Sequence, residues 1–200
     1  MANTTIKLPQ PAIDGNLSVE AALKNRRSIR EYQNKALTLK ELSQLLWSAQ
    51  GITGSSSHYR TTPSAGATNP LKLYLIAGEI TGLDAGIYHY DPMNNSLSLE
   101  KKGDYRIQLA QAALNQSFIA DAPAAIIFTA VFNRTTAKYG QRGIRYVYME
   151  VGHAAQNIYL QSVPLGLGTV VVGAFEDDKI KQILEQPDKE PLYIMPMGWV

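Results

Sequence analysis

The chain has 200 residues, of which 45% are hydrophobic and 18% charged, and its net charge is +2. These values are typical of a soluble globular protein, and since no repeat or linker divides the sequence, we expect a single domain over 1–200. The weak charge and the lack of Lys/Arg runs argue against a nucleic-acid partner, and no apolar run is long enough to span a membrane. The absence of cysteine excludes disulfides, thiolate metal sites and cysteine nucleophiles; it is compatible with a cytoplasmic location, which we expect.

The N-terminal part is expected to begin with an extended arm over 1–17, followed by a short helix over 19–25. Thr38 and Glu41 stand three apart before an apolar run, a pattern typical of a capping box, and predict a helix that stops at Gly51.

The segment 54–69 is rich in Ser, Thr, Gly and Pro, and it predicts a long loop of the kind that is usually functional or disordered. After it, alternation and turn residues predict, in order, a strand at 71–77, a hairpin from 87–92 to 96–99, a helix from Asp104 to about Gln116, and a buried strand at 124–132.

The last third is expected to contain a polar segment, 134–143, and then the longest helix, about 144–163, which ends at Gly166. Small residues at its centre, Gly152, Ala154 and Ala155, would let another helix approach closely. A strand at 169–175, a helix capped by Asp177 or Asp178, and a strand at 192–197 follow. This order favours an α+β fold.

A cluster of cationic side chains follows the first helix: Arg26, Arg27 and Arg30, with Ser28 among them. An extended backbone would direct Arg26, Ser28 and Arg30 to one side. Guanidinium groups and a hydroxyl suit a phosphate oxyanion. The alternative is a solvated basic turn that closes the helix, since cations favour helix C-termini.

Other kinds of site find little support. His58, His89 and His153 stand far apart, so no metal site is predicted; we expect His153 in the core and His89 at the surface. No Gly-x-Ser-x-Gly elbow is present, and Gly166-Leu167-Gly168 lacks the third glycine of a dinucleotide fingerprint.

Three segments remain as candidates: the anion site at 26–30, the small-residue loop at 63–69, and a glycine-bearing strand end at 172–174. Phosphate, ribityl hydroxyls and a planar ring would find suitable groups there. The three segments are therefore compatible with a flavin mononucleotide (FMN) site.

The sequence Arg-Arg-Ser-Ile-Arg-Glu-Tyr, 26–32, resembles the phosphate-binding opening of the nitroreductase superfamily. The resemblance continues in order through 42–52, 60–67, 86–92, 138–143, 150–157 and 166–175. In these motifs the chain is similar to the SagB-type dehydrogenase branch of that superfamily.

This resemblance implies a nitroreductase-like α+β fold: a central, mostly antiparallel sheet flanked by helices, with a long central helix in an intertwined homodimer. Two FMN molecules would lie in the dimer interface. The implied function is an FMN-dependent oxidoreductase, in which hydride passes from NAD(P)H through the flavin to a small electrophile such as a nitroaromatic or quinone.

The resemblance also implies roles for individual residues. Phosphate and ribityl would be held by Arg26, Arg27, Ser28 and Arg30. The partner chain would contribute Pro63, Ser64, Ala65 and Gly66. Asn69 would lie near the ring, and the backbone of Gly173 and Ala174 would face the flavin N5 side. Many members have a further phosphate-binding Lys or Arg after the last strand; none stands there in this chain, so the Arg cluster or another basic residue is expected to serve.

Lys138 and Tyr139 leave a choice between functions. In azoline-oxidising members of the branch, a Lys-Tyr pair at this motif removes a proton, which implies a dehydrogenase acting on a peptide heterocycle. Alternatively Lys138 faces solvent and Tyr139 only packs, as in a simple nitroreductase. A flavin-binding protein without redox turnover is the third possibility.

Overall fold

The computed structural model describes residues 5–54 and 59–200, so His58 lies outside the described residues. In this part of the chain one sheet contains β1 (Thr5–Lys7), β3 (Leu71–Ala77), β5 (Gly86–Asp91), β6 (Ser96–Lys102), β7 (Ala124–Ala130), β8 (Leu167–Thr169) and β9 (Glu190–Trp199). Their order is β1-β6-β5-β3-β7-β9-β8, and every neighbouring pair is antiparallel. Two short strands, β2 (Leu37–Thr38) and β4 (Ile80–Thr81), pair in parallel beside it.

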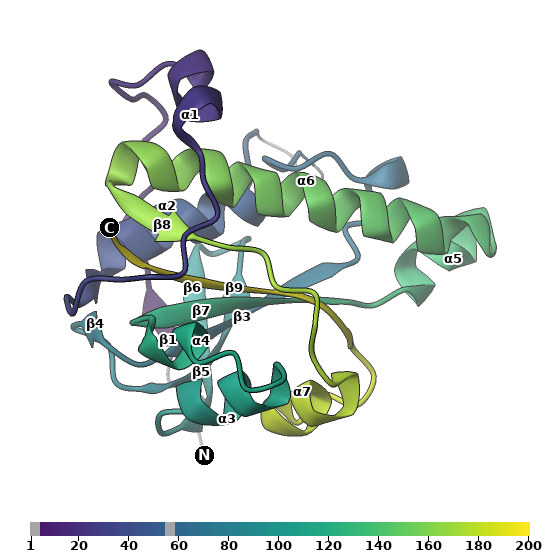
Figure 1. Cartoon of the computed structure of the whole chain (residues 1–200). Coiled ribbons are helices and arrows are strands. Elements are labelled where there is room, and N and C mark those ends of the chain that lie inside the picture. Colours follow the sequence, from purple (N-terminus) through teal and green to yellow (C-terminus); the bar gives the residue numbers. More distant parts are fainter. Residues whose placement is uncertain (1–4, 55–58) are drawn as a thin grey trace.

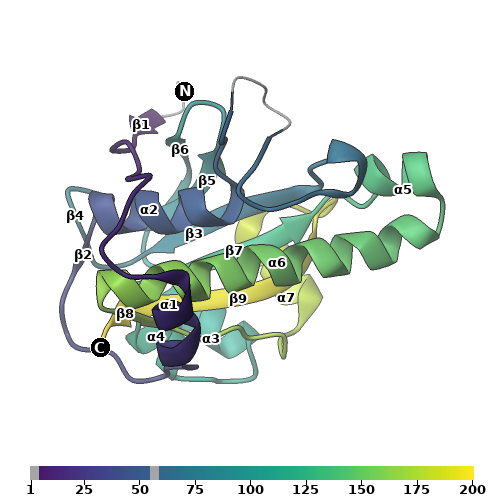
Figure 2. The ribbon, with the colours of Figure 1, turned by 90° about the horizontal axis from the view of Figure 1, so that it is seen from above.

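Helices cover both faces of this sheet (Figures 1 and 2). They are α1 (Val19–Asn25), α2 (Leu39–Gln50), α3 (Arg106–Ala112), α4 (Phe118–Asp121), α5 (Asn133–Tyr139), α6 (Arg142–Leu165) and α7 (Asp177–Leu184). The helices α2 and α6 pack on one face, whereas α3, α4 and α7 pack on the other. The expected α+β fold with a mostly antiparallel sheet and one long helix is confirmed.

The central strand β7 explains why the sheet needs both layers. All seven of its residues are buried. Ile126 and Phe128 belong to the apolar cluster that includes α2 and α6, while Ile127 belongs to the cluster of the opposite layer. Successive side chains of a strand point to opposite faces, so a continuous apolar run requires cover on each.

Two helix boundaries follow from local chemistry as the sequence indicates. The capping box of α2 is present: the Thr38 hydroxyl accepts from the Lys40 amide at 3.2 Å, and the Glu41 carboxylate accepts from the Thr38 amide at 2.8 Å. The helix ends before Gly51. At the end of α6, Gly166 has φ +69° and its amide donates to the carbonyl of Val163, which confirms the predicted helix stop.

The helix predicted to run from Asp104 to about Gln116 is shorter. Asp104 does accept a hydrogen bond from the Arg106 amide at 3.1 Å, but α3 ends at Ala112. Leu114 and Asn115 adopt left-handed conformations, with φ +58° and +61°. The Gln116 side chain donates through Nε2 to the carbonyl of Ala113, a group that a longer helix would have bonded internally, and to the carbonyl of Ala174.

The polar segment 134–143, for which only its polarity was predicted, is largely helical, in α5 and the start of α6. Two other predictions need correction. Of the strand expected at 169–175, only Thr169 lies in a regular strand, at the end of β8. The Val171 amide donates to the Tyr159 hydroxyl at 2.9 Å, so the strand ladder is interrupted there. Glu176, not Asp177 or Asp178, precedes α7, and no side chain caps that helix.

Both described histidines differ from their predictions. His153 is exposed on α6, because the buried stripe of this helix passes through Ala154 and Ala155. His89 is half-buried, and its ring lies 5.3 Å from that of Tyr74. Its pKa is lowered, chiefly by burial and then by the nearby Lys72.

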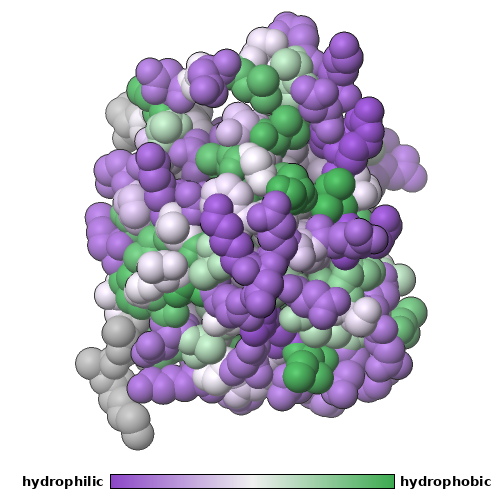
Figure 3. Space-filling model, turned by 60° about the vertical axis from the view of Figure 1, so that its left-hand side comes forward, coloured by the Kyte–Doolittle hydropathy of each residue, from purple (hydrophilic) through white to green (hydrophobic). Residues whose placement is uncertain are grey.

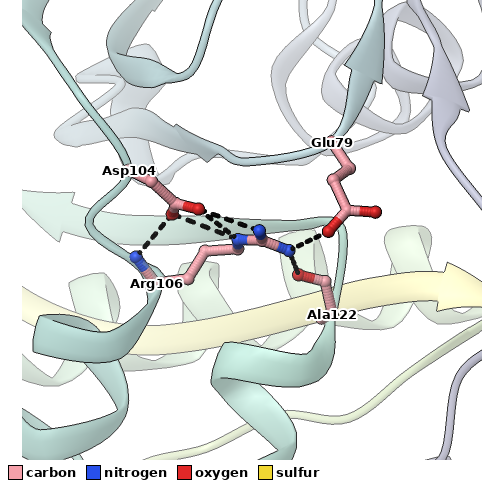
Figure 4. Close-up of polar contacts among 4 residues, drawn as sticks. All are labelled: Glu79, Asp104, Arg106 and Ala122. Carbon is pink, nitrogen blue, oxygen red and sulfur yellow. Dashed lines mark hydrogen bonds and ion pairs between the residues drawn. The ribbon is translucent and has the colours of Figure 1, made fainter. Parts of the chain in front are cut away.

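Arg106 joins three segments on the layer of α3 (Figure 4). Its guanidinium contacts the Asp104 carboxylate at 2.8 Å, the Glu79 carboxylate at 3.1 Å and the carbonyl of Ala122 at 3.1 Å. A side chain on Gly78 would meet the same guanidinium at 2.0 Å. The glycine that follows β3 therefore makes room for this connection.

No helix within 5–54 and 59–200 combines the length and apolarity needed to cross a bilayer. On the face in Figure 3, hydrophilic side chains cover much of the surface, and hydrophobic patches are scattered between them.

The cap of α2 leads to the first prediction. Replacement of Thr38 by Ala should lower the free energy of unfolding by about 1 kcal/mol, because the first turn loses its side-chain acceptor. Lys40→Ala, an exposed change in the same turn, is the control and should change stability by less than about 0.5 kcal/mol. Urea denaturation measures both; equal effects of the two substitutions would contradict the role of the cap.

Candidate functional site

The basic segment after α1 runs beside β8. Ser28 forms a parallel bridge with Thr169, and the Ile29 amide donates to the carbonyl of Thr169 at 3.0 Å. The Arg26 guanidinium lies 5.0 Å from the centre of the Tyr159 ring, and the Ser28 hydroxyl lies 3.0 Å from the Tyr159 hydroxyl. Arg26 and Ser28 therefore face the same side chain, as their spacing predicts.

The hydroxyl of Tyr159 is positioned from two directions. It accepts from the Val171 amide at 2.9 Å and shares a hydrogen bond with Ser28. If Tyr159 is the donor in that pair, the hydrogen of the exposed Ser28 hydroxyl is available to an external anion.

The remaining two arginines of the segment take different directions. Arg27 turns back and donates to the carbonyls of Lys24 and Arg26 at 2.9 and 2.7 Å, so this residue closes α1, as the alternative interpretation required. Arg30 is exposed, with its guanidinium 5.7 Å from the centre of the Phe118 ring. In the described chain, none of these arginines forms an ion pair with a carboxylate.

Gly173 and Ala174 are exposed close to the same region. The carbonyl of Ala174 accepts from Gln116 at 3.1 Å, and Phe118, two residues further along, lies under Arg30. The turn between α3 and α4 thus connects the strand end with the basic segment. Sequence reasoning missed this turn; the signal was Asn115, a residue type that tolerates the left-handed conformation it adopts.

A second group of candidates forms around the loop 63–69. The Ser64 hydroxyl donates to the Glu150 carboxylate at 2.6 Å and accepts from the Asn69 amide at 2.9 Å. Pro63 is exposed, Ala65 is half-buried in a single 3₁₀ turn (Ala65–Ala67), and Asn69 is buried with φ +46°.

Gly66 brings the Lys-Tyr pair into this group. Its φ is +58°, and a side chain there would lie 2.5 Å from the Tyr139 hydroxyl and 2.6 Å from the Lys138 ammonium. The Lys138 ammonium lies 3.4 Å from the carbonyl of Gly66. Lys138 is exposed, while the Tyr139 ring packs edge-on against Tyr146 at 5.2 Å. The two polar ends therefore occupy the space that a side chain on residue 66 would fill, and the left-handed φ also favours glycine there.

Glu150 is the residue of this group that sequence reasoning missed as a site residue. It is 2% exposed, and its Oε1 atom has no hydrogen-bond partner among the described residues. Burial raises the pKa of Glu150 to about 7, although the hydrogen bond from Ser64 and the charges of Arg60 and Arg134 oppose the shift. The sequence did contain a signal for it, because a carboxyl group at an apolar position of an amphipathic helix is unusual and indicates a specific role.

The two groups are separated along α6. Tyr159 marks the basic segment and Glu150 marks the 63–69 loop, and nine residues of helix correspond to about 14 Å. One chain therefore brings Arg26, Ser28, Arg30 and the 173–174 backbone to one place, and the loop with Lys138 and Tyr139 to another. Within 5–54 and 59–200 no cluster of three or more His, Cys, Asp or Glu side chains could hold a metal ion.

The buried carboxyl leads to a prediction for pH dependence. Because the pKa of Glu150 is above its usual value of 4.5, the folded chain binds this proton more tightly than the unfolded chain. Its contribution to stability is complete below about pH 4.5 and is lost as the pH rises through about 7, a change on the order of 3 kcal/mol. Glu150→Gln should remove this pH dependence.

Urea denaturation between pH 5 and pH 8 tests the prediction, with the exposed change Glu100→Gln as control. A Glu150→Gln variant whose stability still falls with pH as steeply as that of the parent would contradict the assignment.

Comparison with known proteins places this geometry in a family. The model of the Nitroreductase family matches residues 23–199. A nitroreductase-like protein of Methanocaldococcus jannaschii, MJ1384, is 46% identical over 194 residues, which cover 97% of this chain and 96% of the relative. The crystal structure of a nitroreductase-like protein from Ralstonia eutropha has a TM-score of 0.86 and 29% identity; the match covers 98% of this chain and 89% of that one.

A more distant relative agrees with the resemblance to the SagB-type branch. The microcin B17-processing protein McbC of Escherichia coli is 26% identical over 171 residues, which cover 81% of this chain and 62% of McbC. The match to the family model extends over most of the chain, and the archaeal relative aligns almost from end to end. This chain is therefore an oxidoreductase of the nitroreductase family.

Proposed function

We propose that the protein binds FMN between two copies of the chain and transfers electrons from NAD(P)H to a small electrophile such as a nitroaromatic or a quinone. The observation that carries this proposal is the convergence of Arg26, Ser28 and Arg30 with the exposed 173–174 backbone. When bound, FMN would supply the hydride chemistry, and the protein would supply binding, orientation and exclusion of water.

The donors of the basic segment fit a phosphate. Arg26 and Arg30 are held by aromatic rings of Tyr159 and Phe118, which fix their side chains without neutralising them. Charge-assisted hydrogen bonds from guanidinium to phosphate are the stronger kind, and the Ser28 hydroxyl adds a neutral donor. With these three donors, the phosphate would not require the further Lys or Arg that many members of the superfamily have after the last strand.

The separation of the two candidate groups supports a shared site in a homodimer. The loop with Pro63, Ser64, Ala65 and Gly66 would reach the flavin of the neighbouring copy. On α6, Tyr148 is 55% exposed and Met149 52% exposed, and the space beside Gly152 is open. An apolar helical face with an opening for close approach suits a second copy of the same helix.

The residues around the ring would act mainly through hydrogen bonds. The exposed backbone at Gly173 and Ala174 and the small residues of the loop allow a flat ring to lie close to the main chain. Donors placed near the pyrimidine edge would stabilise the negative charge of a reduced flavin. Asn69 is buried and hydrogen-bonded to Ala67, so it would act by holding the loop rather than by reaching far from it.

The first test is the absorption spectrum of the purified protein, followed by release of the chromophore on denaturation. Arg26→Ala and Arg30→Ala should each cost about 2–4 kcal/mol of FMN affinity, because each removes a cation from the bound phosphate. Lys24→Ala, an exposed change in the last turn of α1, is the control. Unchanged FMN affinity in both arginine variants would refute the phosphate assignment, and flavin without NAD(P)H turnover would indicate a binding protein.

The position of Lys138 and Tyr139 favours a second candidate, an azoline-type dehydrogenase in which a peptide heterocycle loses a proton to this pair and hydride to the flavin. Both polar ends lie over Gly66, in the loop proposed to contact the flavin. A tyrosine or lysine can act as a base when its surroundings lower its pKa.

Substitution separates the two candidates. Under the peptide hypothesis, Lys138→Met and Tyr139→Phe should each lower the oxidation of an azoline peptide by about a hundredfold or more, with reduction of a nitroaromatic intact. Under the first hypothesis the peptide is not oxidised by any variant. Equal loss of both activities would indicate that the pair supports the flavin site as a whole.

A further inference from the structure

A small polar pocket lies beside the 63–69 loop, apart from the basic segment at 26–30. Five of its lining side chains are used below. Gln50 ends α2, Lys72 lies in β3 and Arg134 in the first turn of α5, while Arg60 and Asn69 come from the segment between α2 and β3. The space in which a water-sized molecule can be centred is about 30 Å³, which is enough for roughly two waters or one small ion.

Three cations converge on this pocket without an ion partner. No carboxylate in the described ranges lies within 4.0 Å of Arg60, Lys72 or Arg134. The nearest acids are otherwise engaged: Asp91 accepts from the Met93 amide and the Asn94 side chain, and Glu150 accepts from Ser64.

Burial and the closeness of the positive charges together lower the pKa values of two of these cations, Lys72 and Arg60. The pKa of Lys72 is lowered by burial and then by the charges of Arg134, Arg60 and Lys189, against which Asp91 acts alone. The pKa of Arg60 is lowered, chiefly by burial and also by the charge of Arg134. Tyr90, Asp91 and Glu150 oppose this shift without cancelling it. Neighbouring like charges that are partly removed from water destabilise one another unless an anion binds.

Unsatisfied hydrogen-bonding atoms gather at the same place. Among the described residues, the buried side-chain atoms without a partner are Gln50 Nε2, Arg60 Nε, Asn69 Oδ1 and Glu150 Oε1. The first three belong to residues that line the pocket, and Gln50 and Asn69 are only 3% and 7% exposed. Buried polar atoms without a partner are rare in native proteins, and an unseen ligand is one of their ordinary explanations.

We propose that this pocket is an anion site that binds a carboxylate group. Its two oxygens would accept hydrogen bonds from Gln50 Nε2 and Arg60 Nε and face the ammonium of Lys72, while the exposed Arg134 lies at the mouth. Asn69 Oδ1 is an acceptor like the carboxylate oxygens, so it would face a water at the mouth of the pocket rather than the anion. The volume admits the carboxylate but not a bulky group behind it.

The anion would also affect the candidate loop. The Arg134 Nε atom donates to the carbonyl of Thr68 at 2.9 Å, and the Asn69 amide donates to Ser64 at 2.9 Å. Two of the pocket residues thus hold the loop from its C-terminal side. The inference needs no flavin, and its test is independent of the proposed function.

Thermal denaturation of the full chain in sodium formate and in sodium chloride, at equal ionic strength and pH, provides the test. Formate should raise the Tm of the parent chain by roughly 2–4 °C relative to chloride. Lys72→Met keeps the aliphatic length without the charge; it should be at least as stable as the parent in chloride and should weaken formate binding by roughly thirtyfold or more.

Lys102→Met, an exposed change on β6 away from the pocket, is the matched control and should keep the formate effect. Arg134→Met gives a second variant at the solvent-exposed mouth and should reduce the effect. A formate effect of the same size in the parent and in Lys72→Met, or no effect in the parent, would overturn the proposal.

A second ligand, benzoate, distinguishes a small free carboxylate anion from the carboxylate arm of a larger molecule. If formate and benzoate both raise the Tm, and both effects depend on Lys72, the pocket receives the carboxylate arm of a larger molecule through its mouth. If only formate does so, the ligand is a small free anion. Both results support the anion site.

Discussion

The packing of α6 against the sheet is the interaction on which the rest of the structure depends. Its buried stripe of Val147, Val151, Ala154, Ala155 and Ile158 fixes the helix over the strands. Because the stripe fixes the rotation of α6 about its axis, it also fixes the directions in which the polar side chains of this helix point. Asn157 donates to the carbonyls of Ser48 and Thr61 and to the hydroxyl of Thr62, all within 3.2 Å, and so ties the end of α2 to the chain after it.

The same helix organises both groups of candidate residues. Tyr159 orients Ser28 and the main chain at Val171, while Glu150, about two and a half turns away, holds Ser64. A rigid helix keeps these two anchors at a constant separation, which a flexible connection could not do. A ligand shared between two copies of the chain would depend on this constant separation, because each copy would have to hold its basic segment and its 63–69 loop at a fixed distance.

Charge distribution distinguishes the basic segment at 26–30 from the pocket beside the 63–69 loop. Arg26 and Arg30 are held by aromatic rings at the surface, where water reduces the cost of an unpaired charge. Arg60 and Lys72 are partly buried, so their charges weigh more heavily on the folded state. A protonated Glu150 cannot neutralise them, and an ionised Glu150 would do so only at the cost of its own burial. Binding of an anion in the proposed pocket would therefore be linked to the ionisation of Glu150 through Arg60 and Arg134.

The sequence by itself determined the elements whose signals are local. The capping box before α2, the apolar run of β7 and Gly166 after α6 were each readable, because caps, strand patterns and left-handed turns depend on neighbouring residues. The spacing of Arg26 and Ser28 also predicted their common side.

Only the tertiary structure decided which distant side chains meet. It turned Arg27 back onto α1, interrupted the strand at Val171 with a hydroxyl from α6, and placed Gln116 beside the strand end. It also assembled Arg60, Lys72 and Arg134 into one pocket. These contacts join residues far apart in the chain, and their geometry follows from how the layers pack on the sheet, which no local pattern encodes.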